Sequence, residues 1–194
     1  MTVQQALAKG HRVVALSQNL DTLPEHANLT KIKGSATNAS DIAKAITASD
    51  AVIVTIGTRA LGVTTLYSQA ARSILQAFKA TGSQAPLIVL TGFGAGESGK
   101  YQGFVTKLLF SLLLKKVYAD KTVMEEIITA SSTNWEIVRP GRLVDKPLTG
   151  TYKQYLSLEP GMKIGAIARA DVAHFLVAQA ESPSALKKYV GLTS

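Results

Sequence analysis

Tyr118 and Lys121 are the residues whose types and spacing come nearest to a catalytic pair. In a Y-x-x-x-K arrangement the lysine lowers the pKa of the tyrosine, so that the phenol can transfer a proton. Here the spacing is one residue short, and Val117, which cannot titrate, stands four residues before Lys121. Tyr118 and Lys121 can still be neighbours on a helix. Lys121 therefore has two open interpretations, a binding residue or an exposed lysine beside Glu125.

The glycine-rich segment 92–100 matches two phosphate-binding patterns in part. Gly94, Gly96 and Gly99 fit G-x-G-x-x-G, and Gly99 followed by a lysine fits most of G-x-x-x-x-G-K-[ST]. However, Tyr101 stands where the second pattern needs a hydroxyl for magnesium, and no acidic residue follows at the distance that dinucleotide binding favours. We predict a flexible glycine loop over a crevice. A P-loop nucleotide hydrolase is the disfavoured alternative.

Five apolar segments end in small, polar or glycine residues, which let a ligand approach backbone N–H groups. In a doubly wound sheet, ligands bind beyond the carboxyl ends of the strands. Ordinary turns use the same residue types, so a shared crevice and plain turns both stay open. The five ends are Ser17-Gln18-Asn19, Gly34-Ser35, Gly57-Thr58-Arg59, Thr91-Gly92 and Pro140-Gly141-Arg142.

Strand and helix patterns alternate along the chain, which predicts an α/β fold: a Rossmann-like, doubly wound, mainly parallel sheet with helices on both faces. Strands are expected at 12–16, 29–33, 51–56, 87–90, 135–138 and 188–192. Helices are expected at 1–9, 41–48 (capped by Ser40), 65–80, 104–114, 119–131 and 169–180. The uninterrupted apolar, β-branched runs 51–56 and 87–90 should be the most buried strands.

Composition excludes several classes of protein. The chain has 194 residues, no cysteine and only three scattered histidines, so disulfides, thiolate chemistry and a structural zinc site are not expected. Its longest apolar run, 104–114, is too short to span a bilayer, and no signal region opens the chain. The net charge of +8 is scattered and not interleaved with aromatics. We therefore expect a cytoplasmic protein with a small-molecule substrate and no nucleic-acid or membrane partner; the oligomeric state is not readable.

The order of several motifs resembles the atypical short-chain dehydrogenase/reductase family, nearest its NmrA-like and biliverdin reductase B or flavin reductase-like NAD(P)-binding branch. The main matches are A-D-K at 119–121, M-E-E at 124–126 and W-E-I-V-R-P-G-R-L at 135–143. Further matches lie at 11–16, 49–53, 147–152 and 169–173, so the resemblance covers nearly the whole chain. It implies one NAD(P)-binding Rossmann-like domain over residues 1–194.

For the adenosine end of the cofactor, the resemblance implies that Ser17, Gln18 and Asn19 flank the ribose and that Ser35 meets the adenine. An arginine at the Gln18 position favours NADP in this family and is absent here, so NADP and NAD both remain open. Gly57 and Thr58 would line the dinucleotide.

For the nicotinamide end, the resemblance implies that Thr91 and Gly92 lie beside the ring. Pro140, Gly141 and Arg142 would pack against it. Lys121 matches the lysine of the catalytic tyrosine–lysine pair, while Val117 occupies the tyrosine position. Lys121 and Thr91 are accordingly the expected catalytic residues.

The largest departure from the family is at the front. The family begins with a strand and a G-x-x-G-x-x-G loop, whereas this chain begins at the following helix. That strand would be the central one, and its loop would hold the pyrophosphate. Without it, the strands expected at 12–16 and 51–56 should keep unpaired edges.

The expected activity is hydride transfer from NAD(P)H to a flavin, a quinone or another conjugated acceptor. With no tyrosine in the proton-donor position, the reduced acceptor would take its proton from water. The alternative is a non-catalytic NAD(P)-binding sensor or regulatory protein of the NmrA type.

Overall fold

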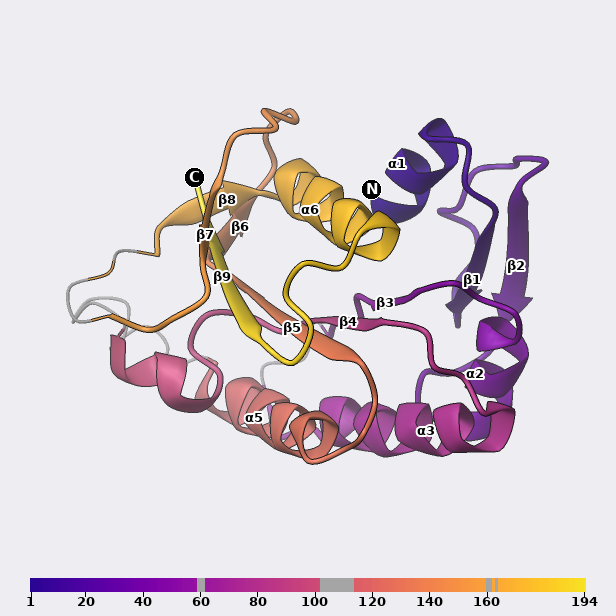
Figure 1. Cartoon of the computed structure of the whole chain (residues 1–194), viewed down its shortest axis with the longest axis horizontal. Helices are drawn as coiled ribbons and strands as arrows, with labels where there is room; N and C mark the ends of the chain where they lie inside the picture. Colours follow the sequence, from indigo (N-terminus) through magenta and orange to yellow (C-terminus); the bar gives the residue numbers. More distant parts are fainter. Residues whose placement is uncertain (59–61, 102–113, 160–161, 163) are drawn as a thin grey trace.

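The computed structural model describes residues 1–58, 62–101, 114–159, 162 and 164–194 (Figure 1). The helix expected at 104–114 lies almost entirely outside these residues. The described elements follow the expected alternation of strands and helices. In chain order they are α1 (Thr2–Ala8), β1 (Val13–Ser17), β2 (Leu29–Lys33), α2 (Ala39–Ile46), β3 (Val52–Val54), α3 (Leu66–Thr81), β4 (Leu87–Leu90), the 3₁₀ helix η1 (Gly96–Tyr101), α5 (Lys115–Thr129), β5 (Trp135–Pro140), β6 (Arg142–Val144), β7 (Lys153–Tyr155), β8 (Ala166–Ala168), α6 (Arg169–Glu181) and β9 (Tyr189–Thr193).

The strands form a five-stranded sheet in the order β3-β4-β5-β9-β7 and two separate parallel pairs, β1-β2 and β6-β8. Every pairing is parallel except that of β7 with β9. Helices provide the crossovers that parallel neighbours require. The prediction of a Rossmann-like, mainly parallel α/β fold is confirmed.

Helices cover both faces of the five-stranded sheet (Figure 1). One core lies between the sheet and α2, α3 and α5, where Val89 and Ile137 contact Ile74, Met124 and other helix residues. The second lies against α6, where Ile88 and Val138 contact Phe175 and its neighbours. Successive side chains along a strand point to opposite faces, so each central strand contributes to both cores.

Burial differs between the two strands expected to be the most buried. The first three residues of β4 are fully buried, as predicted, whereas β3 is only partly buried at Val52 and Ile53. Instead β5 is buried along its whole length. The reason is position: β3 is an edge of the five-stranded sheet, and β5 lies between β4 and β9.

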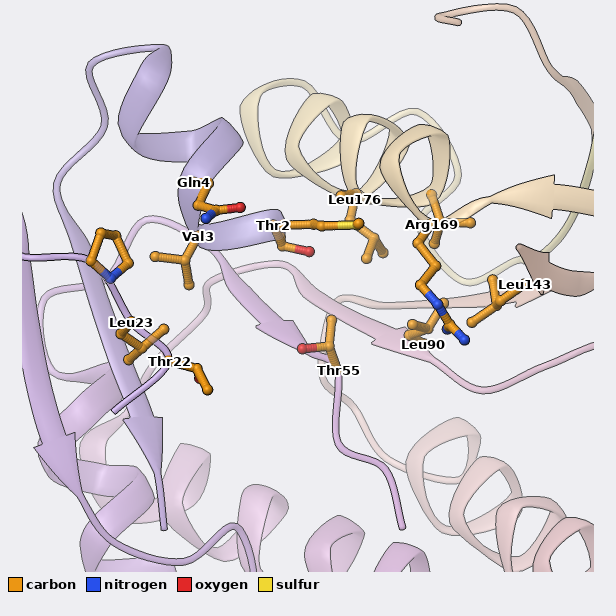
Figure 2. A pocket seen from close by; sticks show the side chains of 14 residues that line it. Thr2, Val3, Gln4, Thr22, Leu23, Thr55, Leu90, Leu143, Arg169 and Leu176 are labelled. Carbon is orange, nitrogen blue, oxygen red and sulfur yellow. The ribbon is translucent and has the colours of Figure 1, made fainter. Parts of the chain in front are cut away.

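The sheet is interrupted between β1 and β3. In the part of the chain that the structure describes, β1 pairs only with β2 and β3 pairs only with β4, so one edge of each is unpaired. A pocket of about 410 Å³ lies in this region, between α1 and the loop after β1 on one side and α6 on the other. Figure 2 shows Thr55 and Leu90 at its floor and Arg169 and Leu143 at one end.

Local features correct three details of the expected elements. Asn38, and not Ser40, caps α2, because its side chain accepts hydrogen bonds from the backbone N–H groups of Ser40 and Asp41. The strand expected at 135–138 extends two residues further, so that Pro140 is the last residue of β5. The short strands β6, β7 and β8 were not expected, since three residues carry too little periodicity to detect. No helix among the described residues is long and apolar enough to cross a membrane.

Candidate active site at the carboxyl end of β4

Thr91 and Gly92 follow β4 directly and are buried. The Thr91 backbone N–H donates to the carbonyl of Val138 on β5, so the β4–β5 ladder continues to this point. A Cβ on Gly92 would lie 2.5 Å from the hydroxyl of Tyr118. Only glycine therefore allows Tyr118 to approach the end of β4 this closely.

Lys121 joins α5 to the end of β4. Its ammonium group donates to the carbonyl oxygen of Thr91 at 2.7 Å. It also lies 5.2 Å from the ring centre of Tyr67 and 4.7 Å from that of Tyr118. Burial lowers the pKa of Lys121 to about 8, although the nearby charge of Glu125 opposes the shift. The exposed-lysine interpretation of Lys121 is thereby wrong.

Tyr118 and Lys121 lie together despite their short spacing, but not as an activated pair. Burial, with smaller contributions from Tyr67 and Glu125, raises the pKa of Tyr118 to about 12. A lysine that activates a tyrosine for proton transfer would lower this pKa instead. Lys121 instead faces the Tyr118 ring and donates its hydrogen bond to the carbonyl of Thr91.

Asp120 connects this site to the next strand end. Its carboxylate accepts hydrogen bonds from the backbone N–H groups of Tyr67 at 2.8 Å and Ser68 at 3.3 Å, at the start of α3. A helix N-terminus favours a carboxylate in this position. The Tyr67 hydroxyl is in turn hydrogen-bonded by the backbone of Thr58, which follows β3. Hydrogen bonds to residues of α3 and α5 thus connect the end of β3 with the end of β4.

Gln18 and Ser35 lie in a second pocket, of about 580 Å³, between the ends of β1 and β2 and the start of α3. This brings together two of the residues expected at the adenosine end. The Ser35 hydroxyl is hydrogen-bonded to that of Thr37, and its N–H donates to Asp41. Thr64 and Gln69 complete a wall of hydroxyl and amide groups. Such neutral donors and acceptors suit the adenosine of a dinucleotide.

The other predicted site residues lie in the turn after β1, after β3 and at the junction of β5 and β6. The Ser17 hydroxyl accepts from the N–H of Asn19 in the turn after β1. Gly57 is exposed after β3, and Arg142 is exposed in β6. Pro140 is buried, and a Cβ on Gly141 would lie 2.0 Å from the carbonyl oxygen of Gly165, so no larger residue fits there.

The glycine-rich segment is a packed turn, not a loop lying over the crevice. Phe93, Ala95 and Ser98 are buried. The N–H of Gly94 donates to the hydroxyl of Ser98, and that of Gly96 donates to the hydroxyl of Thr122. These two donors are satisfied within the protein, which argues against a phosphate cradle in this segment.

Sequence reasoning did not single out Arg139, Glu125 and Glu97 as site residues. The Arg139 guanidinium is buried and contacts both carboxylates. An arginine inside the apolar run of β5 is a signal that could have identified it, because arginine is rarely buried without a partner. Among the described residues, no group of three His, Asp or Glu residues is arranged to hold a metal ion.

The sheet is Rossmann-like, and polar strand ends lie between the pocket of neutral side chains and Lys121. This is the architecture of a dinucleotide-binding protein. A family model described as NAD(P)H-binding matches residues 1–183. The chain belongs to this NAD(P)H-binding family.

Solved structures with the same fold include several reductases. The anaerobilin reductase ChuY from Escherichia coli is 25% identical, with a TM-score of 0.77 over 99% of this chain and 89% of that one. A short-chain dehydrogenase/reductase from Veillonella parvula, solved with NADP, is 17% identical, with a TM-score of 0.83 over 100% and 88%. A candidate NADH-flavin reductase from Streptococcus pneumoniae is 21% identical, with a TM-score of 0.78 over 100% and 92%.

Proposed function

We propose that this protein is an NAD(P)H-dependent reductase that delivers hydride to a flavin, a quinone or another conjugated acceptor. The observation that carries the proposal is the placement of Lys121. Its ammonium group is held by Thr91 at the end of β4, between two aromatic rings. The reductases among the structural neighbours support the reaction class.

In this proposal the chain positions the cofactor, and bound NAD(P)H supplies the hydride. Gln18 and Ser35 would hold the adenosine in their pocket. Lys121 has three N–H donors and uses one on Thr91, so it has donors left for a ribose hydroxyl. The nicotinamide would lie against Thr91, Gly92 and Pro140.

Tyr118, the phenol described at the end of β4, is not acidified, because burial raises its pKa to about 12. This favours acceptors that need no proton from a side chain. Reduced flavins and quinols take their protons from water. A simple ketone would instead require a general acid at its oxygen.

Steady-state oxidation of NADH and NADPH, with FMN or menadione as acceptor, tests the proposal. We expect turnover with at least one acceptor and a decrease of kcat/KM of at least tenfold in Lys121→Ala. Glu126→Gln on the exposed face of the same helix is the matched control. Dinucleotide binding without turnover on any acceptor would contradict the proposal and favour the sensor.

A further inference from the structure

Arg139 is a deeply buried charged side chain near the candidate site, and the hydride-transfer proposal leaves its function unexplained. Only 2% of its surface is exposed, and it is the last residue but one of β5. Its guanidinium lies 3.8 Å from the ring centre of Tyr189 on β9. A cation here requires compensation, because burying an unpaired charge costs several kcal/mol.

Two carboxylates on different elements supply that compensation. Glu125 of α5 accepts from Nε of Arg139 at 3.1 Å and from Nη2 at 2.7 Å. Glu97 of η1 accepts from Nη1 at 2.8 Å and from Nη2 at 3.3 Å. The guanidinium fork is thus bound on two sides, an arrangement that lysine cannot reproduce.

The inner carboxylate also contacts the site. Glu125 is 2% exposed and accepts from the hydroxyl of Thr91 at 2.6 Å. Thr91 in turn accepts from Lys121 through its carbonyl. Hydrogen bonds therefore connect Arg139 to Glu125, Glu125 to the hydroxyl of Thr91, and the carbonyl of Thr91 to Lys121.

The outer carboxylate holds the glycine-rich turn. Glu97 is half-exposed, so its contact with Arg139 is the one that solvent can reach. Gly96, beside it, has a φ of +53°, and a Cβ there would lie 2.8 Å from Nη2 of Arg139. The turn is shaped around the guanidinium, and a side chain at position 96 would displace it.

We propose that Arg139 is the positioning residue of this site: it fixes Glu125, which orients Thr91 and balances the charge of Lys121, and it docks the turn that carries Glu97. The importance of this role for catalysis rests on the proposed function. The positioning itself concerns only this chain's own residues and can be measured without cofactor.

The charged and titratable groups around Lys121 predict opposite effects for two variants. Tyr67 faces it from α3, Tyr118 and Glu125 face it from α5, and Arg139 and Glu97 act through Glu125. Arg139→Met removes a positive charge and leaves two carboxylates uncompensated, so the Lys121 pKa should rise by about one unit. Glu97→Gln removes a negative charge, so that pKa should fall by a few tenths of a unit.

The experiment is a titration of [ε-¹³C]lysine-labelled protein by NMR without dinucleotide, with Lys121 assigned from the spectrum of Lys121→Arg. We expect the Lys121 midpoint to rise in Arg139→Met, to fall in Glu97→Gln and to stay unchanged in Glu126→Gln, which removes an exposed carboxylate one residue from Glu125. An unchanged midpoint in Glu97→Gln would overturn the proposal, even where Arg139→Met does not fold.

A kinetic measurement separates this proposal from the proposed function. With Glu97→Gln, kcat for NADH oxidation should fall at least fivefold while the Kd for NADH changes less than twofold, because Glu97 acts on Thr91 through Arg139 and Glu125 and does not line the adenosine pocket. A kcat equal to wild type would contradict the positioning role. If the wild-type protein turns over no acceptor, the reductase proposal fails, and the titration still decides the role of Arg139.

Discussion

At the scale of the residue, Lys121 and Tyr118 show what happens when a tyrosine and a lysine are separated by three positions in place of the four of the Y-x-x-x-K pair. An α-helix advances about 100° per residue, so a phenol three residues before the lysine is displaced from the place it takes at a spacing of four. The structure puts the lysine over the face of the Tyr118 ring. The ammonium group is thereby directed to a carbonyl, and the phenol keeps its proton.

These positions predict unequal effects of mutation. Lys121→Ala should lower kcat/KM at least tenfold, because a charge-assisted hydrogen bond to a ribose contributes about 1.5–3 kcal/mol. Tyr118→Phe should leave kcat/KM nearly unchanged. Steady-state kinetics with NADH or NADPH and FMN compares the two variants with the wild type. A hundredfold loss in Tyr118→Phe beside a silent Lys121→Ala would show that the phenol is the general acid.

At the scale of the element, β5 is buried along its whole length and yet has an ionisable side chain on each face. Arg139 faces α5 and is fully paired. Glu136 points to the opposite face, and neither of its carboxylate oxygens has a hydrogen-bond partner of normal geometry among the described residues. Burial raises the pKa of Glu136 to about 7, and the backbone of Ala185 offsets this only in part.

Glu136 should make stability fall as the pH rises. Its pKa is about 7 in the folded protein and about 4.5 in the unfolded chain, so the folded state binds more protons between these values. The free energy of unfolding should lose up to about 3 kcal/mol between pH 4.5 and 7 from this group. Below pH 4.5 the carboxyl is protonated in both states and contributes no such loss.

Urea unfolding of the wild type and Glu136→Gln at pH 4.5 and pH 8 measures this effect. The glutamine variant should gain stability relative to wild type as the pH rises, because its amide does not ionise. Glu126→Gln, which alters an exposed carboxylate, should show no such trend. A stability difference between wild type and Glu136→Gln that is the same at both pH values would contradict the shifted pKa.

At the scale of the whole molecule, the sheet is divided between the two strand ends that we expect to bind a dinucleotide. Strand ends that would contact the adenosine belong to β1 and β2, whereas Thr91 follows β4 in the five-stranded sheet. The unpaired edges of β1 and β3 and the pocket beside them separate the two halves. In dinucleotide-binding folds a glycine-rich turn and a helix N-terminus bind the pyrophosphate at such a junction.

We therefore expect the chain from Met1 to bind NADH and NADPH weakly. Adding roughly 10–20 residues before it, as one apolar strand and a glycine turn, should place a strand that pairs with both β1 and β3, and should raise the affinity. Calorimetry on both proteins measures the change, and an extension with a proline in the strand is the matched control, because proline cannot donate to a ladder. A Kd near 1 μM for the chain from Met1, about −8 kcal/mol, would refute this expectation.

The sequence alone predicted what depends on local pattern. Apolar runs identified the segments that became β1, β2, β3, β4, β5 and β9, and their separation by helices implied a parallel sheet. The family resemblance around residues 119–121 predicted Lys121 as a site residue, and this role stays a prediction. Strands β6, β7 and β8 were missed, because three residues contain too little pattern and are stabilised by distant partners.

Only the tertiary structure decided which charges meet. Glu97, Glu125 and Arg139 are separated by up to 42 positions, and spacing along a chain cannot reveal a contact made across three elements. The same holds for β3, whose sequence is apolar enough for a central strand but which lies at an edge. Local propensity follows from neighbouring residues, whereas burial and ion pairing follow from the packing of elements that are remote in sequence.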